Sequence, residues 1–171
     1  MADAPERIRL LLLDVDGVLT DGGIYVGADG SETKRFRVHD GLAIAAWHRL
    51  GRTTAILSGR STPAVEARAA ELGIEHVAQG IGDKRKRFHE LLRQLDIEPV
   101  EVCFVGDDLP DLPVLREVGF PAAPANAVRE VREAVRYVAE RPGGSGAVRE
   151  IIEHLLEGER GWSTIVERYG S

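Results

Sequence analysis

The chain has 171 residues, of which 43% are hydrophobic and 29% charged, a composition typical of one soluble globular domain. Its formal net charge of -6 argues against nucleic acid as a general partner. No apolar run approaches the roughly 20 residues of a membrane span, and residues 1–7 lack the features of a signal peptide, so we expect a cytoplasmic protein without a membrane segment.

Short apolar runs alternate with amphipathic stretches along the chain. Ile8–Leu13, Thr53–Leu57 and Val100–Val105 each predict a buried strand, and the lone Cys103 inside the third is expected to be a packing residue. Weaker strand candidates are 76–77, 121–123 and 137–138. Runs that are apolar throughout are typical of parallel strands that are covered on both faces.

The stretches between these runs predict helices. Gly41–Leu50 follows Asp40, a plausible N-cap, and Thr62–Leu72 begins with Pro63 at its first helical position and ends at Gly73. Apolar residues recur at helical spacing over 88–95 and again over 148–156. We therefore predict an α/β fold, a doubly wound, Rossmann-like, mostly parallel sheet with helices on both faces.

Two segments stand apart from this alternation within the single domain that we expect over residues 1–171. Residues 22–38 predict a protruding β-hairpin around Asp29-Gly30, and an isolated hairpin is marginal in water, so it should pack on its own domain or on another subunit. The C-terminal tail, 157–171, contains a short amphipathic helix whose apolar side chains either dock on a partner or close the core.

Aspartates follow two of the predicted strands. Asp14 and Asp16 follow the first, and their spacing of two sends both side chains the same way, while Gly17 allows a sharp turn. Asp107 follows the third strand, with Asp111 four residues on, and Asp108 between them is either a supporting residue or a helix N-cap. Carboxylates gathered at strand ends repel one another unless a cation such as Mg²⁺ neutralises them.

The remaining polar residues suit phosphoryl transfer. Ser58 ends the second strand, Gly59 lets a backbone amide approach a phosphate, and Lys84 supplies a point charge. Asp14 is placed to attack phosphorus, and Asp16 is placed to act as general acid and base. Each of these residues taken alone is equally an ordinary turn residue or a solvated charge, so the prediction depends on the whole set and its order.

The motifs around Asp14 and Asp16, Ser58, Lys84, and Asp107 and Asp111 resemble those of the haloacid dehalogenase superfamily of Mg²⁺-dependent phosphatases. The resemblance implies that Asp14 is the nucleophile and Asp16 the acid and base. It implies that Mg²⁺ is held by the Asp14 carboxylate, the Asp107 side chain and the backbone carbonyl of Asp16. Asp111, one helical turn after Asp107, and the supporting Asp108 are expected in outer positions. Short spacings between the motifs leave no room for a cap domain, so we expect a capless enzyme.

A finer resemblance is to the 3-deoxy-D-manno-octulosonate (KDO) 8-phosphate phosphatase family. It is carried by segments 14–22, 40–41, 58–60, 106–109 and 143–150, although Ser145 stands where that family usually has arginine. It implies a cytoplasmic homotetramer, with hairpins paired at its centre, that releases phosphate from a small phosphorylated sugar acid in lipopolysaccharide precursor synthesis.

Three residues are candidates for binding the sugar acid. Arg60 fits the KDO branch, because a guanidinium beside the phosphate site can pair with a substrate carboxylate in bidentate fashion. Lys34 and Arg37 on the hairpin are expected either to meet the sugar acid of an adjacent subunit or to be solvated charges.

Other functions stay open at this point. The chain is alternatively a phosphatase of a nine-carbon sugar acid 9-phosphate (KDN or N-acylneuraminate), or a non-catalytic subunit that keeps the fold. A phospho-accepting receiver domain shares an acidic pocket, a Ser or Thr and a Lys, but it lacks the Asp-x-Asp pair after the first strand. Release of phosphate from the aspartyl-phosphate distinguishes a phosphatase from a receiver.

Overall fold

The computed structural model of the chain describes residues 8–157 and 161–170, and its centre is a six-stranded sheet. The strand order is β5-β4-β1-β6-β7-β8, and all five pairings are parallel. The strands are β1 (Leu10–Leu13), β4 (Thr53–Leu57), β5 (His76–Ala78), β6 (Val102–Val105), β7 (Phe120–Ala123) and β8 (Tyr137–Val138). All six predicted strands are confirmed. β1 and β6 each start two residues later than predicted, and residues 99–101 before β6 form a 3₁₀ turn.

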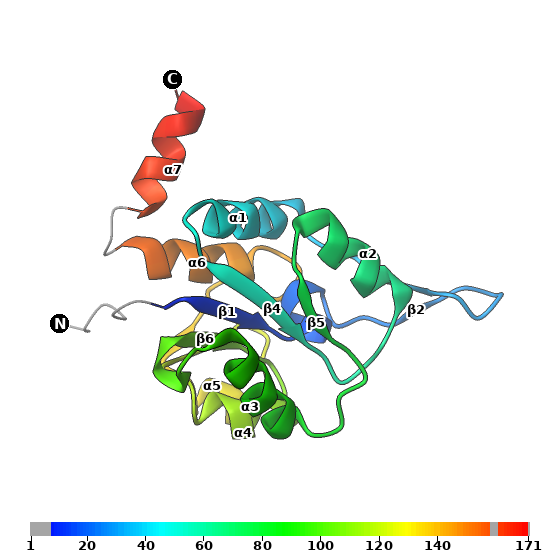
Figure 1. Cartoon of the computed structure of the whole chain (residues 1–171). Coiled ribbons are helices and arrows are strands. Elements are labelled where there is room, and N and C mark those ends of the chain that lie inside the picture. Colours follow the sequence, from blue (N-terminus) through cyan, green and yellow to red (C-terminus); the bar gives the residue numbers. More distant parts are fainter. Residues whose placement is uncertain (1–7, 158–160, 171) are drawn as a thin grey trace.

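Helices cover both faces of this sheet, as predicted (Figure 1). One face carries α1 (Val38–Arg49), α2 (Pro63–Leu72) and α6 (Ala147–Glu157). The other face carries α3 (Lys84–Leu95), α4 (Leu112–Leu115) and α5 (Arg129–Arg132). The chain therefore has the doubly wound α/β architecture that the alternating pattern predicts.

Strand β1 separates two hydrophobic cores. Leu11 and Leu13 pack into the core beneath α1 and α6, whereas Leu10 and Leu12 pack into the core beneath α3. All four leucines are fully buried, which explains why this strand is apolar at every position. Cys103 of β6 is buried in the first core, and its predicted role as a packing residue is confirmed.

The boundaries of α2 agree with the sequence signals, whereas the start of α1 does not. α2 begins with Pro63 and ends at Gly73, whose positive φ of 68° is the left-handed conformation that glycine favours. The prediction that Asp40 caps α1 is wrong, because α1 begins two residues earlier, at Val38. The buried Asp40 carboxylate instead accepts a hydrogen bond from the Arg149 amide in the first turn of α6 (2.9 Å), so it ties these two helices together.

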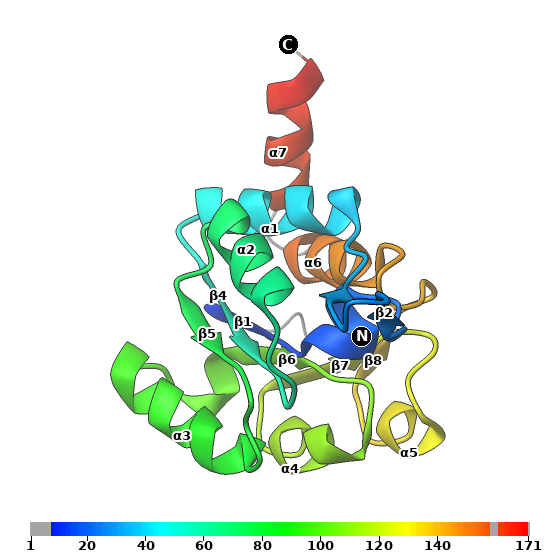
Figure 2. The same ribbon diagram turned by 90° about the vertical axis from the view of Figure 1, so that its right-hand side faces the viewer.

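The predicted hairpin is present and projects from the carboxyl edge of the sheet (Figures 1 and 2). Strands β2 (Tyr25–Val26) and β3 (Glu32–Thr33) pair antiparallel, in a small sheet of their own. Between the aspartates after β1 and Ser58 the chain forms a short turn, this hairpin, α1 and β4, and between Ser58 and Lys84 it forms α2 and β5. The prediction of a capless fold is therefore confirmed.

Helix α7 (Gly161–Gly170) lies at the end of the molecule opposite the hairpin (Figure 1). Ile165 is buried and Trp162 packs on the first core, whereas Val166 and Tyr169 are exposed. Part of the predicted apolar stripe thus closes the core of its own chain. Residues 158–160 and 171 of the predicted tail, and 1–7 of the N-terminus, lie outside the described residues. Within the described residues, no helix combines the length and apolarity that crossing a membrane requires.

Candidate active site

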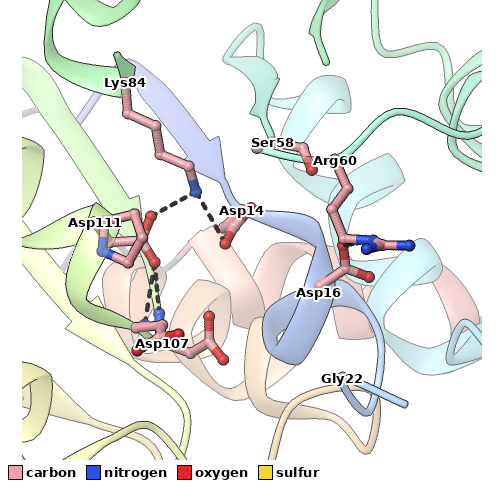
Figure 3. A pocket seen from close by; sticks show the side chains of 11 residues that line it. Asp14, Asp16, Gly22, Ser58, Arg60, Lys84, Asp107 and Asp111 are labelled. Atoms are coloured by element: carbon pink, nitrogen blue, oxygen red, sulfur yellow. Dashed lines mark hydrogen bonds and ion pairs between the residues drawn. The ribbon is translucent and has the colours of Figure 1, made fainter. Parts of the chain in front are cut away.

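The carboxyl ends of β1, β4 and β6 surround a cavity of about 270 Å³. The described residues that line it include most of the predicted site, namely Asp14, Asp16, Ser58, Gly59, Arg60, Lys84, Asp107, Asp108 and Asp111. Lys84 and Asp111 lie on one side of the cavity and Ser58 and Arg60 on the other, with Asp14 between them (Figure 3). Four segments that are distant in sequence thus converge because their strands or helices start or end at one edge of the sheet.

The turn after β1 sets the positions of the first two aspartates. Gly17 has a positive φ of 83°, and a side chain there would overlap the Asp107 carboxylate, so this position requires glycine. The buried Thr20 hydroxyl accepts hydrogen bonds from the amides of Gly17 (3.4 Å) and Gly22 (3.2 Å). Thr20 therefore holds the turn in the conformation that carries Asp16 to the cavity.

Lys84 connects two buried carboxylates. Its Nζ lies 3.0 Å from Asp14 Oδ2 and 2.7 Å from Asp111 Oδ1, and the side chain is 6% exposed. Burial by itself lowers the pKa of Lys84, but the charges of Asp14 and Asp111 outweigh this and raise it above its usual range. Lys84 is therefore a fixed positive charge next to Asp14.

Asp111 also organises the loop after β6. Its Oδ2 accepts hydrogen bonds from the backbone amides of Asp107 (3.0 Å) and Asp108 (3.2 Å). The Asp108 side chain accepts from the Leu109 amide (2.7 Å) at the start of a 3₁₀ turn, which confirms its interpretation as an N-cap. Asp107 is left as the carboxylate of this loop that points into the cavity (Figure 3).

Three carboxylates form a potential cation site. Oxygen atoms of Asp14, Asp107 and Asp111 lie within 4.8 Å of one another. Burial, together with repulsion from Asp111, raises the pKa of Asp14 to about 6, and burial with repulsion from Asp14 and Asp111 raises that of Asp107 to about 7. This donor set fits Mg²⁺, which prefers oxygen ligands and would relieve the repulsion. Since Asp111 is already bonded to Lys84 and two amides, Asp14 and Asp107 are the carboxylates best placed to ligate.

Lys34 lies in the site of its own chain. Its side chain is 1% exposed, and its Nζ lies 2.5 Å from Asp16 Oδ1 and 2.9 Å from Glu32 Oε1. The interpretation of Lys34 as a solvated hairpin charge is wrong, because the base of the hairpin folds back over Asp16. The expected contact of Lys34 with the sugar acid of an adjacent subunit stays a prediction. Arg37 is exposed and does not line the cavity, so its role in substrate binding stays a prediction.

Arg60 completes a network with these groups. Its Nη2 lies 2.6 Å from Glu32 Oε2, and its Nε lies 3.8 Å from Asp16 Oδ2. Arg60 and Lys34 are thus both bridged by the same two carboxylates. Glu32 was not predicted from the sequence. The available signal was its spacing of two from Lys34 in a predicted hairpin strand, because residues at i and i+2 of a strand share one face. In the structure Lys34 directly follows β3.

A family model described as haloacid dehalogenase-like hydrolase matches residues 33–119. The chain belongs to this family. This match includes Ser58, Lys84, Asp107 and Asp111, so three of the four predicted motifs lie inside the region that defines this hydrolase family.

Individual relatives of this HAD-like hydrolase carry more specific names. The 3-deoxy-D-manno-octulosonate 8-phosphate phosphatase KdsC of Escherichia coli K12 is 47% identical over 151 residues, covering 88% of this chain and 80% of the relative. A probable YrbI family phosphatase from Pseudomonas syringae pv. phaseolica has 45% identity and a TM-score of 0.96, over 98% of this chain and 96% of the other.

A third relative is a complex. The crystal structure of 3-deoxy-D-manno-octulosonate 8-phosphate phosphatase from Moraxella catarrhalis contains magnesium, phosphate and KDO. It is 39% identical to this chain with a TM-score of 0.94, over 97% of this chain and 95% of that one.

Proposed function

We propose that the chain is a Mg²⁺-dependent phosphatase that hydrolyses KDO 8-phosphate to KDO and inorganic phosphate through an aspartyl-phosphate. The observation that carries this proposal is the position of Asp14, held by Lys84 beside Asp107 at the carboxyl edge of the sheet. The 47% sequence identity to KdsC and the structural similarity to a phosphatase whose crystal structure contains magnesium, phosphate and KDO support this substrate over other phosphate esters.

Asp14 and Asp16 share the chemistry between them. The Asp14 carboxylate attacks phosphorus, the bond from phosphorus to the sugar oxygen breaks, and Asp16 donates a proton to that oxygen as it leaves. Asp16 then takes a proton from water, whose oxygen attacks phosphorus, and the bond to Asp14 breaks to release phosphate. Attack requires an ionised Asp14, and the Lys84 charge opposes the rise in the Asp14 pKa that burial causes.

The other lining residues hold the phosphoryl group. Lys84, the Ser58 hydroxyl and the Gly59 amide are assigned to its oxygens, which carry the charge that develops during transfer. Asp14, Asp107 and the backbone carbonyl of Asp16 are assigned to Mg²⁺, while Asp111 and Asp108 support the loop. The metal, when bound, supplies positive charge to the transferring group and to the clustered carboxylates.

Arg60 supplies selectivity for a sugar acid. Its side chain is 48% exposed at the rim of the cavity, where its guanidinium can receive the substrate carboxylate in bidentate fashion. Lys34 lies beside it as a second cation, and Arg37 is assigned to the substrate of a neighbouring subunit.

The same family relationship supports a proposal for the assembly and the cellular setting. We assign the chain to a cytoplasmic homotetramer that acts in lipopolysaccharide precursor synthesis, with one domain over residues 1–171. The hairpin exposes Ile24, Tyr25 and Val26 to 55%, 47% and 67%, and an apolar surface of this kind on a small two-stranded sheet favours burial against other hairpins.

The deciding experiment is a substrate panel with purified protein and Mg²⁺. KDO 8-phosphate should be hydrolysed with a much higher kcat/KM than generic phosphate esters. Faster turnover of KDN 9-phosphate or N-acylneuraminate 9-phosphate would move the chain to the nine-carbon branch and keep only the reaction class. No turnover of any ester at saturating Mg²⁺ would leave a non-catalytic subunit.

A further inference from the structure

Glu32 at the base of the hairpin occupies a site built for a carboxylate. Its Oε1 lies 2.9 Å from Lys34 Nζ, and its Oε2 lies 2.6 Å from Arg60 Nη2. Each carboxylate oxygen therefore has its own cation, which is also how two cations would receive the carboxylate of a bound sugar acid.

The Glu32 side chain also closes access to one of these cations. The Lys34 side chain is 1% exposed because it lies between Glu32 and Asp16, whereas the Arg60 side chain is 48% exposed. Hydrogen bonds from Lys34 and Arg60 lower the pKa of Glu32, which favours its charged form. Two cations then face two carboxylates, and no positive charge is left over for an incoming carboxylate unless Glu32 moves.

Glu32 lies on a small sheet that is separate from the central one. Within the described residues, β2 and β3 pair with each other, and one isolated bridge, between Thr20 and Phe36, joins the base of the hairpin to the turn after β1. Phe36 anchors this base on the first core. A shift of Glu32 therefore breaks no pairing in the six-stranded sheet that positions Asp14 and Asp107.

We propose that Glu32 is a specificity-determining residue, an internal carboxylate that occupies the place of the substrate's carboxylate on Lys34 and Arg60 and is displaced by it. This inference rests on the proposed function. A sugar acid exchanges its own carboxylate for that of Glu32 and keeps both cations paired. An ester without a carboxylate leaves Glu32 in place and gains nothing from the two cations, so the exchange favours sugar acids.

The test measures inhibition by the two products separately. Hydrolysis of arabinose 5-phosphate, which has no carboxylate, serves as the assay, with KDO and inorganic phosphate as competitive inhibitors. Glu32→Gln keeps the shape of the side chain but removes the competing charge, so the inhibition constant for KDO and the KM for KDO 8-phosphate should fall about fivefold, the size of one partly exposed ion pair. Inhibition by phosphate and the KM for arabinose 5-phosphate should change by less than about twofold.

Two further variants separate this role from a structural one. Glu32→Asp keeps the charge but is too short to span both cations, so it should also tighten binding of KDO. Glu71→Gln removes a carboxylate from a surface pair with Arg68 (2.7 Å) and should change nothing. If Glu32 only held Lys34 and Arg60 in place, both Glu32 variants would bind KDO more weakly. Unchanged or weaker KDO binding in both variants therefore overturns the inference.

The outcome is distinguishable from failure of the proposed function. Wild-type protein that hydrolyses arabinose 5-phosphate but not KDO 8-phosphate refutes the substrate assignment. In that case the inhibition constants of KDO and phosphate can still be measured. Their change in the Glu32 variants tests the role of Glu32 independently of the substrate assignment.

Discussion

Asp111 and Lys84 form a buried ion pair of 2.7 Å, in which the carboxylate is 1% and the ammonium 6% exposed. The other Asp111 oxygen accepts hydrogen bonds from the backbone amides of Asp107 and Asp108. One carboxylate thus joins Lys84, which we assign to the phosphoryl group, to the loop that presents Asp107, which we assign to Mg²⁺. Asp111 is therefore a positioning residue, which orients Lys84 and Asp107 and does not itself contact the substrate.

Replacing Asp111 with Asn should reduce kcat/KM about 10- to 100-fold, the range for groups that orient metal ligands. The Asn side-chain oxygen can still accept a hydrogen bond from a backbone amide, but the variant lacks the negative charge that holds Lys84. The Mg²⁺ concentration needed for half-maximal activity should therefore also rise. Steady-state kinetics over a Mg²⁺ titration measures both effects. Asp108→Asn is the matched control, because the Asp108 carboxylate lines the same cavity but caps a 3₁₀ turn instead of pairing with Lys84. An equal loss in both variants would contradict the role of Asp111.

Asp14→Asn should abolish turnover, because it removes both the nucleophile and one metal-binding charge. Asp16→Asn should slow turnover about 10²- to 10⁴-fold, the usual contribution of a general acid and base, and should let phosphorylated protein accumulate after acid quench. Asp96→Asn is a suitable control, because Asp96 is exposed at the other end of α3 and its positive φ of 52° suits Asn. Activity within about tenfold of wild type in Asp14→Asn would refute the mechanism.

Most of the fold was predictable because its signals are local. β1 and β6 are apolar at every position since both sheet faces are covered, and Pro63 and Gly73 mark the ends of α2. Asp40 shows where local reasoning fails. A residue before an apolar helical stretch resembles an N-cap, but this carboxylate is used by α6, more than a hundred residues later in the chain.

The candidate site also has a part that the sequence predicts and a part that it does not. Asp14, Lys84 and Asp107 converge because parallel strands end at one edge, which sequence order is enough to predict. The contacts of Glu32 and Lys34 were not predictable, since they depend on the angle at which the hairpin leaves the sheet. A two-stranded ribbon carries no sequence signal for that angle.

The stability of the metal-free protein should fall as pH rises from about 4 to about 7. The pKa of Asp14 is raised to about 6 and that of Asp107 to about 7, both above the usual value of 3.8, so the folded state binds more protons than the unfolded state in this window. Stabilisation from these protons is complete below the unfolded pKa and is lost as pH passes the folded pKa. Mg²⁺ requires ionised ligands, so its stabilising effect should grow over the same range.

Thermal melts with EDTA and with saturating Mg²⁺ at about pH 5 and about pH 8 measure this linkage. The gain in Tm on adding Mg²⁺ should be larger at the higher pH. Asp107→Asn should remove most of this gain while leaving the melt in EDTA less dependent on pH. An equal Mg²⁺ effect at both pH values in wild-type protein would show that these carboxylates are not the ligands.

Gly143→Ala should destabilise the protein by about 1–3 kcal/mol, the usual cost of overpacking, and should also lower activity. A Cβ atom at Gly143 would overlap the carbonyl oxygen of Gly17, and that backbone belongs to the turn that carries Asp16. The neighbouring Gly144 amide donates to Val18 O (3.0 Å), so the glycine segment can retreat only by giving up this bond.

Gly82→Ala is the matched control for Gly143→Ala, since a Cβ atom at Gly82 meets nothing within 4 Å. Chemical denaturation measures the stability of both variants. The kcat for the preferred ester shows whether the turn that carries Asp16 still supports catalysis. The loss of activity in Gly143→Ala should persist well below its melting temperature, because the altered part is the backbone beside Asp16 and not the core. Full activity of the folded variant would mean that the turn adjusts without moving Asp16, and the glycine segment would then serve packing alone.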